Sequence, residues 1–106
     1  MPRILQWLLY IFCLIVLVSC VSYTSFYQGM TAFRAQDYRK AFVRLKPEAR
    51  KGQPDAEYAI GYMYYYGQGV TEDRQKAWYW ISKAARAGQP DAIEAATILK
   101  MPTATK

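Results

Sequence analysis

Few side chains in this 106-residue chain have types and spacings that could carry out chemistry. The sequence contains no histidine, which excludes Ser-His and Cys-His catalysis and imidazole metal sites. Cys13 and Cys20 both lie in an apolar N-terminal stretch, and Ser82 has no base to activate it. The six carboxylates between residues 55 and 94 are explained as helix caps or surface charges. We therefore expect no catalytic residue, no metal and no cofactor, in a protein that is not an enzyme.

The N-terminal stretch has the pattern of an export signal. Arg3 supplies a positive charge, and residues 4–18 then form a nearly continuous apolar run. The run ends in Leu17-Val18-Ser19-Cys20, which resembles the bacterial lipobox, whose cysteine is acylated and becomes the new N-terminus. The resemblance implies a cleaved signal over residues 1–19 and a lipid anchor on Cys20, followed by a short tether over 20–24.

A lipobox also implies a location. It places the mature chain in the cell envelope, lipid-anchored and facing the periplasm. Val21 stands where many lipoproteins of the inner membrane carry an aspartate, which favours the outer membrane. The alternative is an uncleaved single-pass anchor in the inner membrane. The apolar run is short for that, because a spanning helix needs about 20 residues.

An internal repeat occupies the rest of the chain. Residues 49–56 return as residues 85–92 with seven of eight positions identical, at an offset of 36. A period in the mid-thirties, rich in alanine and aromatic residues, predicts helix–turn–helix units stacked as an α-solenoid. Aspartates and prolines that begin helices, and glycines that end them, predict five helices and no strand. The helices are expected over about residues 25–34, 38–51, 54–66, 74–87 and 90–100.

A set of regularly spaced residues adds a family resemblance to the repeat. It comprises Ala59-Ile60-Gly61, Tyr64, Gly67-Gln68-Gly69-Val70, Asp73, Lys76-Ala77, Trp80, Lys83-Ala84-Ala85 and Gly88. Residues 56–88 thereby resemble a SEL-one-like repeat, a relative of the tetratricopeptide repeat with a longer loop between its helices. Small residues would let helices approach, and aromatic residues would fill the wedge between them. The structural residues are expected to be Gly61, Tyr64, Gly67, Gly69, Ala77, Trp80, Ala84 and Ala85.

The predicted architecture is therefore all-α: a short α-solenoid of about two and a half repeats after an N-terminal apolar helix. The first unit is a degenerate tetratricopeptide-like one, the second is SEL-one-like, and a single capping helix would be the first helix of a third unit. Their bounds are expected at residues 25–53, 54–89 and 90–101, followed by a tail over 102–106.

Aromatic side chains suggest a binding surface. In related repeat families, the first helix of each unit lines the concave face. Tyr58, Tyr62 and Tyr65 follow helical spacing and would form one stripe, and Phe26, Met30 and Phe33 would form the matching stripe on the preceding first helix. Tyrosine combines a large contact area with a polar tip, which suits partner binding. The alternative is that these side chains simply pack within the core.

Charge is concentrated in one predicted helix. Residues 34–51 hold seven basic and two acidic side chains, a net charge equal to that of the whole chain from Cys20 onward. A solvated helix face is the simplest explanation, and attraction to an acidic protein partner or to anionic lipid is the functional one. The patch is expected to comprise Arg39, Lys40, Arg44, Lys46, Arg50 and Lys51.

The leading hypothesis is a membrane-anchored, non-catalytic protein-interaction module, acting as an accessory subunit of an envelope machine for motility, secretion or export. One alternative is a periplasmic immunity protein that neutralises a secreted effector such as a phospholipase. Another is a membrane-surface element that binds anionic lipid through the helix at 38–51. Two and a half repeats give a thin core, which predicts a subunit of a larger complex. Nucleic acid is not an expected partner.

Overall fold

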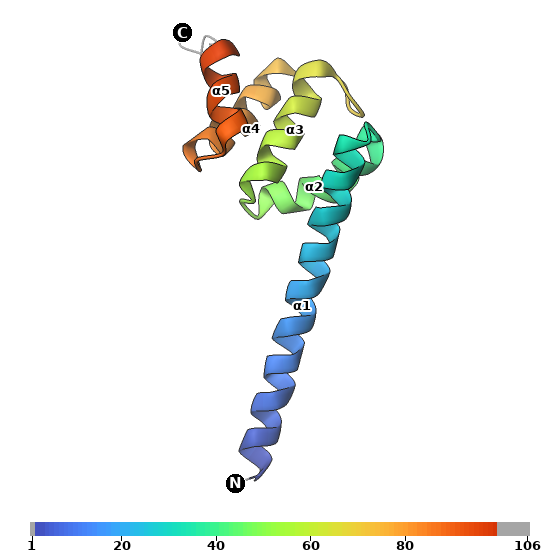
Figure 1. The fold of residues 1–106 in the computed structure, drawn as a ribbon, viewed down its shortest axis with the longest axis vertical. Helices are drawn as coiled ribbons and strands as arrows, with labels where there is room; N and C mark the ends of the chain where they lie inside the picture. The colour runs from blue at the N-terminus through green and yellow to red at the C-terminus, as the bar shows by residue number, and fades with distance from the viewer. Residues whose placement is uncertain (1, 100–106) are drawn as a thin grey trace.

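The computed structural model describes residues 2–99, and the side chains of all of these except residues 21–23. Within this range it contains five helices and no strand, which confirms the all-α prediction. The helices are α1 (Pro2–Arg34), α2 (Tyr38–Arg50), α3 (Pro54–Tyr66), α4 (Arg74–Arg86) and α5 (Pro90–Leu99). The end of α1 and the other four helices form a small domain, from which the rest of α1 projects as a long rod (Figure 1).

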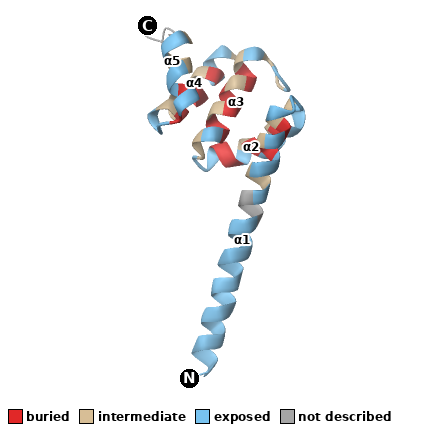
Figure 2. Cartoon of the chain, in the orientation of Figure 1, coloured by how far each residue is buried: buried red, intermediate tan, exposed pale blue. Residues whose placement is uncertain are grey.

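α1 is much longer than the helix predicted over residues 25–34. It runs unbroken from Pro2 to Arg34, so the predicted tether over 20–24 lies inside it. That stretch contains neither proline nor glycine to end a helix. The side chains of residues 4–18 are exposed along the rod (Figure 2). By length and composition α1 could cross a membrane, a test that an N-terminal signal sequence passes equally well.

The other helices pack in chain order, as in a solenoid. Each of α2 to α5 lies against the helix before it, and the end of α1 also touches α3. Buried side chains collect where these helices meet (Figure 2), and they are mostly small or aliphatic. The largest that are fully buried are Leu45, Ile60, Met63, Ile81 and Glu57.

The predicted helix ends agree with the structure to within one residue in α2, α3 and α4. The carboxylate of Asp37 accepts a hydrogen bond from the Lys40 backbone, and that of Asp73 accepts one from the Lys76 backbone, as N-caps do. α3 ends at Gly67 in the left-handed conformation, with φ +66°. The predicted end of the last helix, at Lys100 and Pro102, lies outside the described residues.

Besides α3, three more helix ends have a residue with positive φ just beyond the helix. Gly52 and Gly88, just beyond α2 and α4, have φ of +95° and +91°, and Gln36 takes the same place beyond α1 with φ +64°. In each turn the next backbone N–H reaches back five residues, as from Asp37 to the carbonyl of Ala32. This hydrogen bond gives a partner to a carbonyl in the last turn of the helix that the helix itself does not pair.

Two glycines let neighbouring helices approach closely. A Cβ on Gly61 of α3 would lie 2.6 Å from Cγ1 of Ile81 and 3.1 Å from the carbonyl oxygen of Ala77, so α4 lies directly on this glycine, as predicted. A Cβ on Gly29 of α1 would lie 2.6 Å from Leu45 Cδ2, which holds α2 equally close to α1. Both contacts fix the angle between successive helices.

The two copies of the repeated turn are joined to each other. The side chain of Gln89 is buried and donates a hydrogen bond of 3.1 Å to Oδ1 of Asp55, which belongs to the preceding copy. Its own Oε1 accepts from the backbone of Ala92 and so caps the start of α5. Gln53, the equivalent residue, accepts from the backbone of Asp55 at the start of α3.

Candidate functional site

The tyrosines predicted to form a stripe lie on one face of α3. Tyr58 and Tyr62 have their ring centroids 6.3 Å apart, and Tyr62 lies 4.8 Å from Tyr66, which in turn lies 4.9 Å from Tyr65. Tyr58, Tyr62 and Tyr65 are half-buried, and Tyr66 is 56% exposed. Tyr66 therefore belongs to the row, although the sequence analysis did not include it. Its spacing of four residues from Tyr62 was the signal.

Two of the three α1 residues meet this row. The ring of Phe33 packs edge-on against Tyr62, with centroids 5.3 Å apart, and against Tyr38 at 5.7 Å. Met30 and Phe33 line a depression together with Tyr58. Phe26, one turn before Met30, is half-buried against the core. The α1 and α3 stripes, predicted separately, thus meet at Met30 and Phe33.

A groove lies between α3 and α5. It has a volume of about 140 Å³, with Ile81 of α4 contributing to its lining. Its other lining residues are the four α3 tyrosines (Tyr58, Tyr62, Tyr65 and Tyr66) and Ala95, Ile98 and Leu99 of α5. The α5 residues were not predicted as site residues, although Ala95 and Leu99 are spaced as one helical face is. The groove is mostly apolar, and each of its four tyrosines carries a phenol hydroxyl.

Carboxylates gather at one end of the groove. Asp91 and Glu94 of α5 line a hollow with Tyr58, and Asp55 lines the adjoining depression together with Arg34, the one basic side chain among these lining residues. Burial raises the pKa of Tyr58, and the negative charge of Asp91 raises it further. Burial and the neighbouring Tyr38 raise the pKa of Tyr62. Both phenols stay protonated at neutral pH, and Tyr58 lies beside the acidic side chains.

The expected framework residues surround α3 and α4. Tyr64 and Trp80 are buried and fill the space between the helices, and Ala77 and Ala84 are fully buried where the helices touch. Gly69, with φ +73°, brings the loop between α3 and α4 against α2, because a Cβ there would lie 2.7 Å from the backbone of Tyr38. These observations give the α3–loop–α4 unit the form of a helix–turn–helix repeat.

Comparison with known families identifies this unit. Residues 54–89 match the Sel1 repeat. No curated protein and no solved structure matches the chain. Sel1 repeats generally mediate protein–protein interaction, which fits a non-catalytic interaction module. The match spans α3, the loop and α4, and it ends at Gln89, so the Sel1 repeat supplies one wall of the groove and α5 the other.

The basic residues predicted as one patch do not all share an environment. Arg39, Lys40, Arg44 and Arg50 are exposed on α2. Lys51, beyond the end of α2, is also exposed, with its Nζ 3.4 Å from a carboxylate oxygen of Glu48.

The prediction is wrong for Lys46, which is half-buried and turns into the space between α2 and the Sel1 repeat. Its Nζ lies 3.2 Å from the Tyr64 hydroxyl and 5.1 Å from the centre of the Phe42 ring. The same ammonium is 5.8 Å from the centre of the Trp80 ring. Phe42 and Lys46 lie on the same face of α2. Because this face packs on the Sel1 repeat, Lys46 is placed among the aromatic rings together with Phe42.

The side chains considered for chemistry have ordinary structural settings. The Ser82 hydroxyl donates to the carbonyl oxygen of Trp78, at 2.6 Å, within α4 of the Sel1 repeat. Cys13 and Cys20 are free and exposed on α1. Among the described residues there is no group of three or more histidine, cysteine or acidic side chains that could hold a metal ion.

Proposed function

We propose that this chain is a membrane-tethered adaptor of the bacterial envelope, which holds a partner protein in the groove between α3 and α5. The observation that carries this proposal is the row of four α3 tyrosines, incompletely buried and facing an apolar strip of α5. Tyrosine rings give a large contact area at a low cost in side-chain entropy, which is why they are enriched where proteins bind one another.

The groove also indicates the chemistry of its partner. Ile98, which is 70% exposed, offers an apolar contact, and the phenol hydroxyls offer hydrogen bonds. Asp55, Asp91 and Glu94 add negative charge at one end. The best complement is a short segment with apolar side chains followed by a lysine or arginine. The acidic partner expected from the basic helix does not complement this groove, because the groove is itself acidic at one end.

Two kinds of tether fit the N-terminal part of the chain. Acylation of Cys20, which is exposed on α1, would replace residues 1–19 by lipid. An uncleaved α1 would cross the membrane itself. We favour acylation because of the residues that precede Cys20, with the outer membrane as its destination, and a role as accessory subunit of a motility, secretion or export machine.

Site-specific photo-crosslinking in living cells tests the groove. We would replace Tyr66, which is 56% exposed inside the groove, with p-benzoylphenylalanine. The matched control places the same residue at Tyr79, which is 54% exposed on α4 and is not among the groove residues. The proposal predicts a discrete crosslinked species from position 66 that is absent from position 79. Identical products from both positions, or none from position 66, would contradict it.

The tether is tested by Cys20→Ala and by the mass of the protein purified from membranes. Acylation predicts that the wild-type protein lacks residues 1–19 and carries the mass of its acyl chains, and that the variant keeps its full length. An identical, unmodified full-length mass in both proteins would show that α1 is the anchor.

A further inference from the structure

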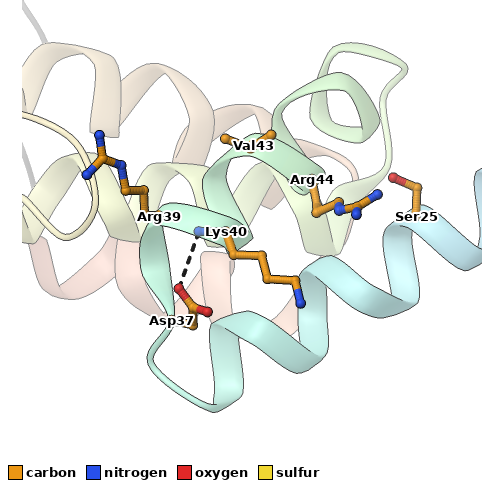
Figure 3. A pocket seen from close by; sticks show the side chains of 6 residues that line it. All are labelled: Ser25, Asp37, Arg39, Lys40, Val43 and Arg44. Atoms are coloured by element: carbon orange, nitrogen blue, oxygen red, sulfur yellow. Dashed lines mark hydrogen bonds between the residues drawn. The ribbon is translucent and has the colours of Figure 1, made fainter.

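A hollow between α1 and α2 lies outside the groove and outside the Sel1 repeat. It has a volume of about 570 Å³ and opens widely to solvent. Ser25 of α1 lines it on one side, and residues of the α1–α2 turn and of α2 line it on the other (Figure 3). Those residues are Asp37, Arg39, Lys40, Val43 and Arg44.

Two of the cations face the α1 side of this hollow. Figure 3 shows the guanidinium of Arg44 reaching toward the Ser25 hydroxyl, and the Lys40 side chain extending over α1, while Arg39 points away. The Asp37 carboxylate lies at the far edge, where it caps α2. Among residues 2–99 no ion pair involves Lys40 or Arg44. The hollow therefore offers two cations and one hydroxyl on its α1 side, and its three basic lining residues outweigh the one carboxylate.

The packing of α1 on α2 holds these groups in place. A Cβ on Gly29 would lie 3.1 Å from Cβ of Arg44, so the base of the Arg44 side chain lies directly on α1, one turn beyond Ser25. Leu45, the next residue, is fully buried against the same glycine. An arginine anchored in this way loses less side-chain freedom on binding an anion than one on a mobile loop does.

The hollow sits where α1 leaves its apolar stretch. Ser25 is seven residues beyond Val18, the end of the apolar run, which corresponds to about 10 Å along a helix. It is five residues beyond Cys20, or about 7 Å. The headgroup layer on each side of a bilayer is roughly 5–8 Å deep. With either tether, Lys40 and Arg44 are therefore within reach of the lipid phosphates.

We propose that this hollow binds the phosphate group of an anionic phospholipid in the membrane that holds the chain. Arg44 and Lys40 supply charge-assisted hydrogen bonds to the phosphate oxygens, and the Ser25 hydroxyl supplies a further donor. A lipid bound between α1 and α2 would fix the height of the domain above the bilayer. This inference relies on the membrane tether of the proposed function and not on the groove.

Native mass spectrometry of the full-length chain in mild detergent tests the site, with phosphatidylglycerol as the probe. We expect the wild-type protein to retain one phosphatidylglycerol molecule in preference to phosphatidylcholine. Lys40→Gln/Arg44→Gln should weaken that binding by roughly thirtyfold, and Arg44→Lys should keep part of it. The matched control, Lys76→Gln/Arg86→Gln, removes the same charge from exposed positions on α4 and should bind as the wild type does.

Four results would overturn the proposal. They are equal binding of phosphatidylcholine, equal loss in the α4 control, undiminished binding by Lys40→Gln/Arg44→Gln, and displacement of the lipid by inorganic phosphate or by a hexaglutamate peptide. The last would assign the hollow to a free anion or to an acidic protein segment. The Tyr66 crosslink in the Lys40→Gln/Arg44→Gln variant separates the two proposals, because it should persist there if the groove acts independently.

Discussion

The ammonium of Lys83 in α4 lies 3.5 Å from a carboxylate oxygen of Glu57 in α3, whose side chain is only 1% exposed. The other oxygen of Glu57 is buried and has no hydrogen-bond partner within residues 2–99. A buried carboxylate is costly unless a cation stays beside it, so this one contact holds a charged group inside the Sel1 repeat.

Removing the cation should therefore destabilise the domain. We expect Lys83→Met to lower the free energy of unfolding by about 2 kcal/mol, because it leaves Glu57 buried and unpaired. Adding Glu57→Gln in the same chain should restore part of the loss. Urea unfolding measures both. The control is Glu72→Gln, which breaks an exposed pair with Arg74 and should cost less than about 1 kcal/mol. A loss no larger than that of the control would show that Lys83 does not compensate Glu57.

Gln36 offers the opposite test, a substitution that should stabilise. It holds φ +64°, a conformation that costs a residue with a Cβ about 1 kcal/mol and costs glycine little. Gln36→Gly should raise the free energy of unfolding by about that amount, despite the greater freedom of glycine in the unfolded chain. Gly88→Ala, at the same place in its turn and in open space, should lower it by a similar amount. Thermal unfolding of the two variants should shift in opposite directions.

Close approach at Gly61 predicts a larger loss. Gly61→Ala places a methyl group 2.6 Å from Ile81 Cγ1 and 3.1 Å from the backbone of α4, and should cost about 1–3 kcal/mol. Ile81→Ala removes the side-chain part of the clash, so the double variant should lose less than the sum of the two single losses. Denaturant unfolding of the wild type and the three variants gives the four free energies of this double-mutant cycle. Strict additivity would mean that the two residues are not coupled.

The raised pKa of Tyr58 makes the free energy of unfolding depend on pH in the alkaline range. Its pKa lies above the ordinary value of about 10 in the folded chain, through burial first and Asp91 second. The unfolded chain loses this proton at lower pH, so the contribution is fully present below pH 10 and is lost as pH rises through the folded value. Asp91→Asn should lower that folded value, whereas Glu72→Gln should leave it unchanged. Tyrosinate absorbance of the folded and urea-unfolded chains, with Tyr58→Phe to assign the step, measures the shift.

Helix boundaries were predictable because the sequence marks them locally. Asp37, Asp73 and Gly67 act through hydrogen bonds and backbone angles within a few residues, so their effect needs no knowledge of distant packing. The continuation of α1 through residues 20–24 was not predicted, because that stretch carries no local signal for a helix end or start. A membrane signal was expected to end there, yet no residue in that stretch stops a helix.

Side-chain environments depended on packing that the sequence does not mark. Lys46 was counted with the surface cations, but α2 is rotated so that its Phe42 face meets Tyr64 and Trp80. The groove requires α5 to pack on α4, which brings Ile98 opposite the α3 tyrosines. A spacing pattern identifies which residues share a helical face, whereas the neighbour of that face is decided by how the helices stack.

The hydrogen bond from Gln89 to Asp55 joins one repeated turn to the preceding copy. Asp91 stands in the later turn where Asp55 stands in the earlier one, with the same offset of 36 residues. Each turn thus carries both a glutamine that can donate this hydrogen bond and an aspartate that can accept it. A copy of residues 54–89 inserted after Gln89 would bring its own glutamine–aspartate pair, so this joint is modular and can recur in arrays of different length.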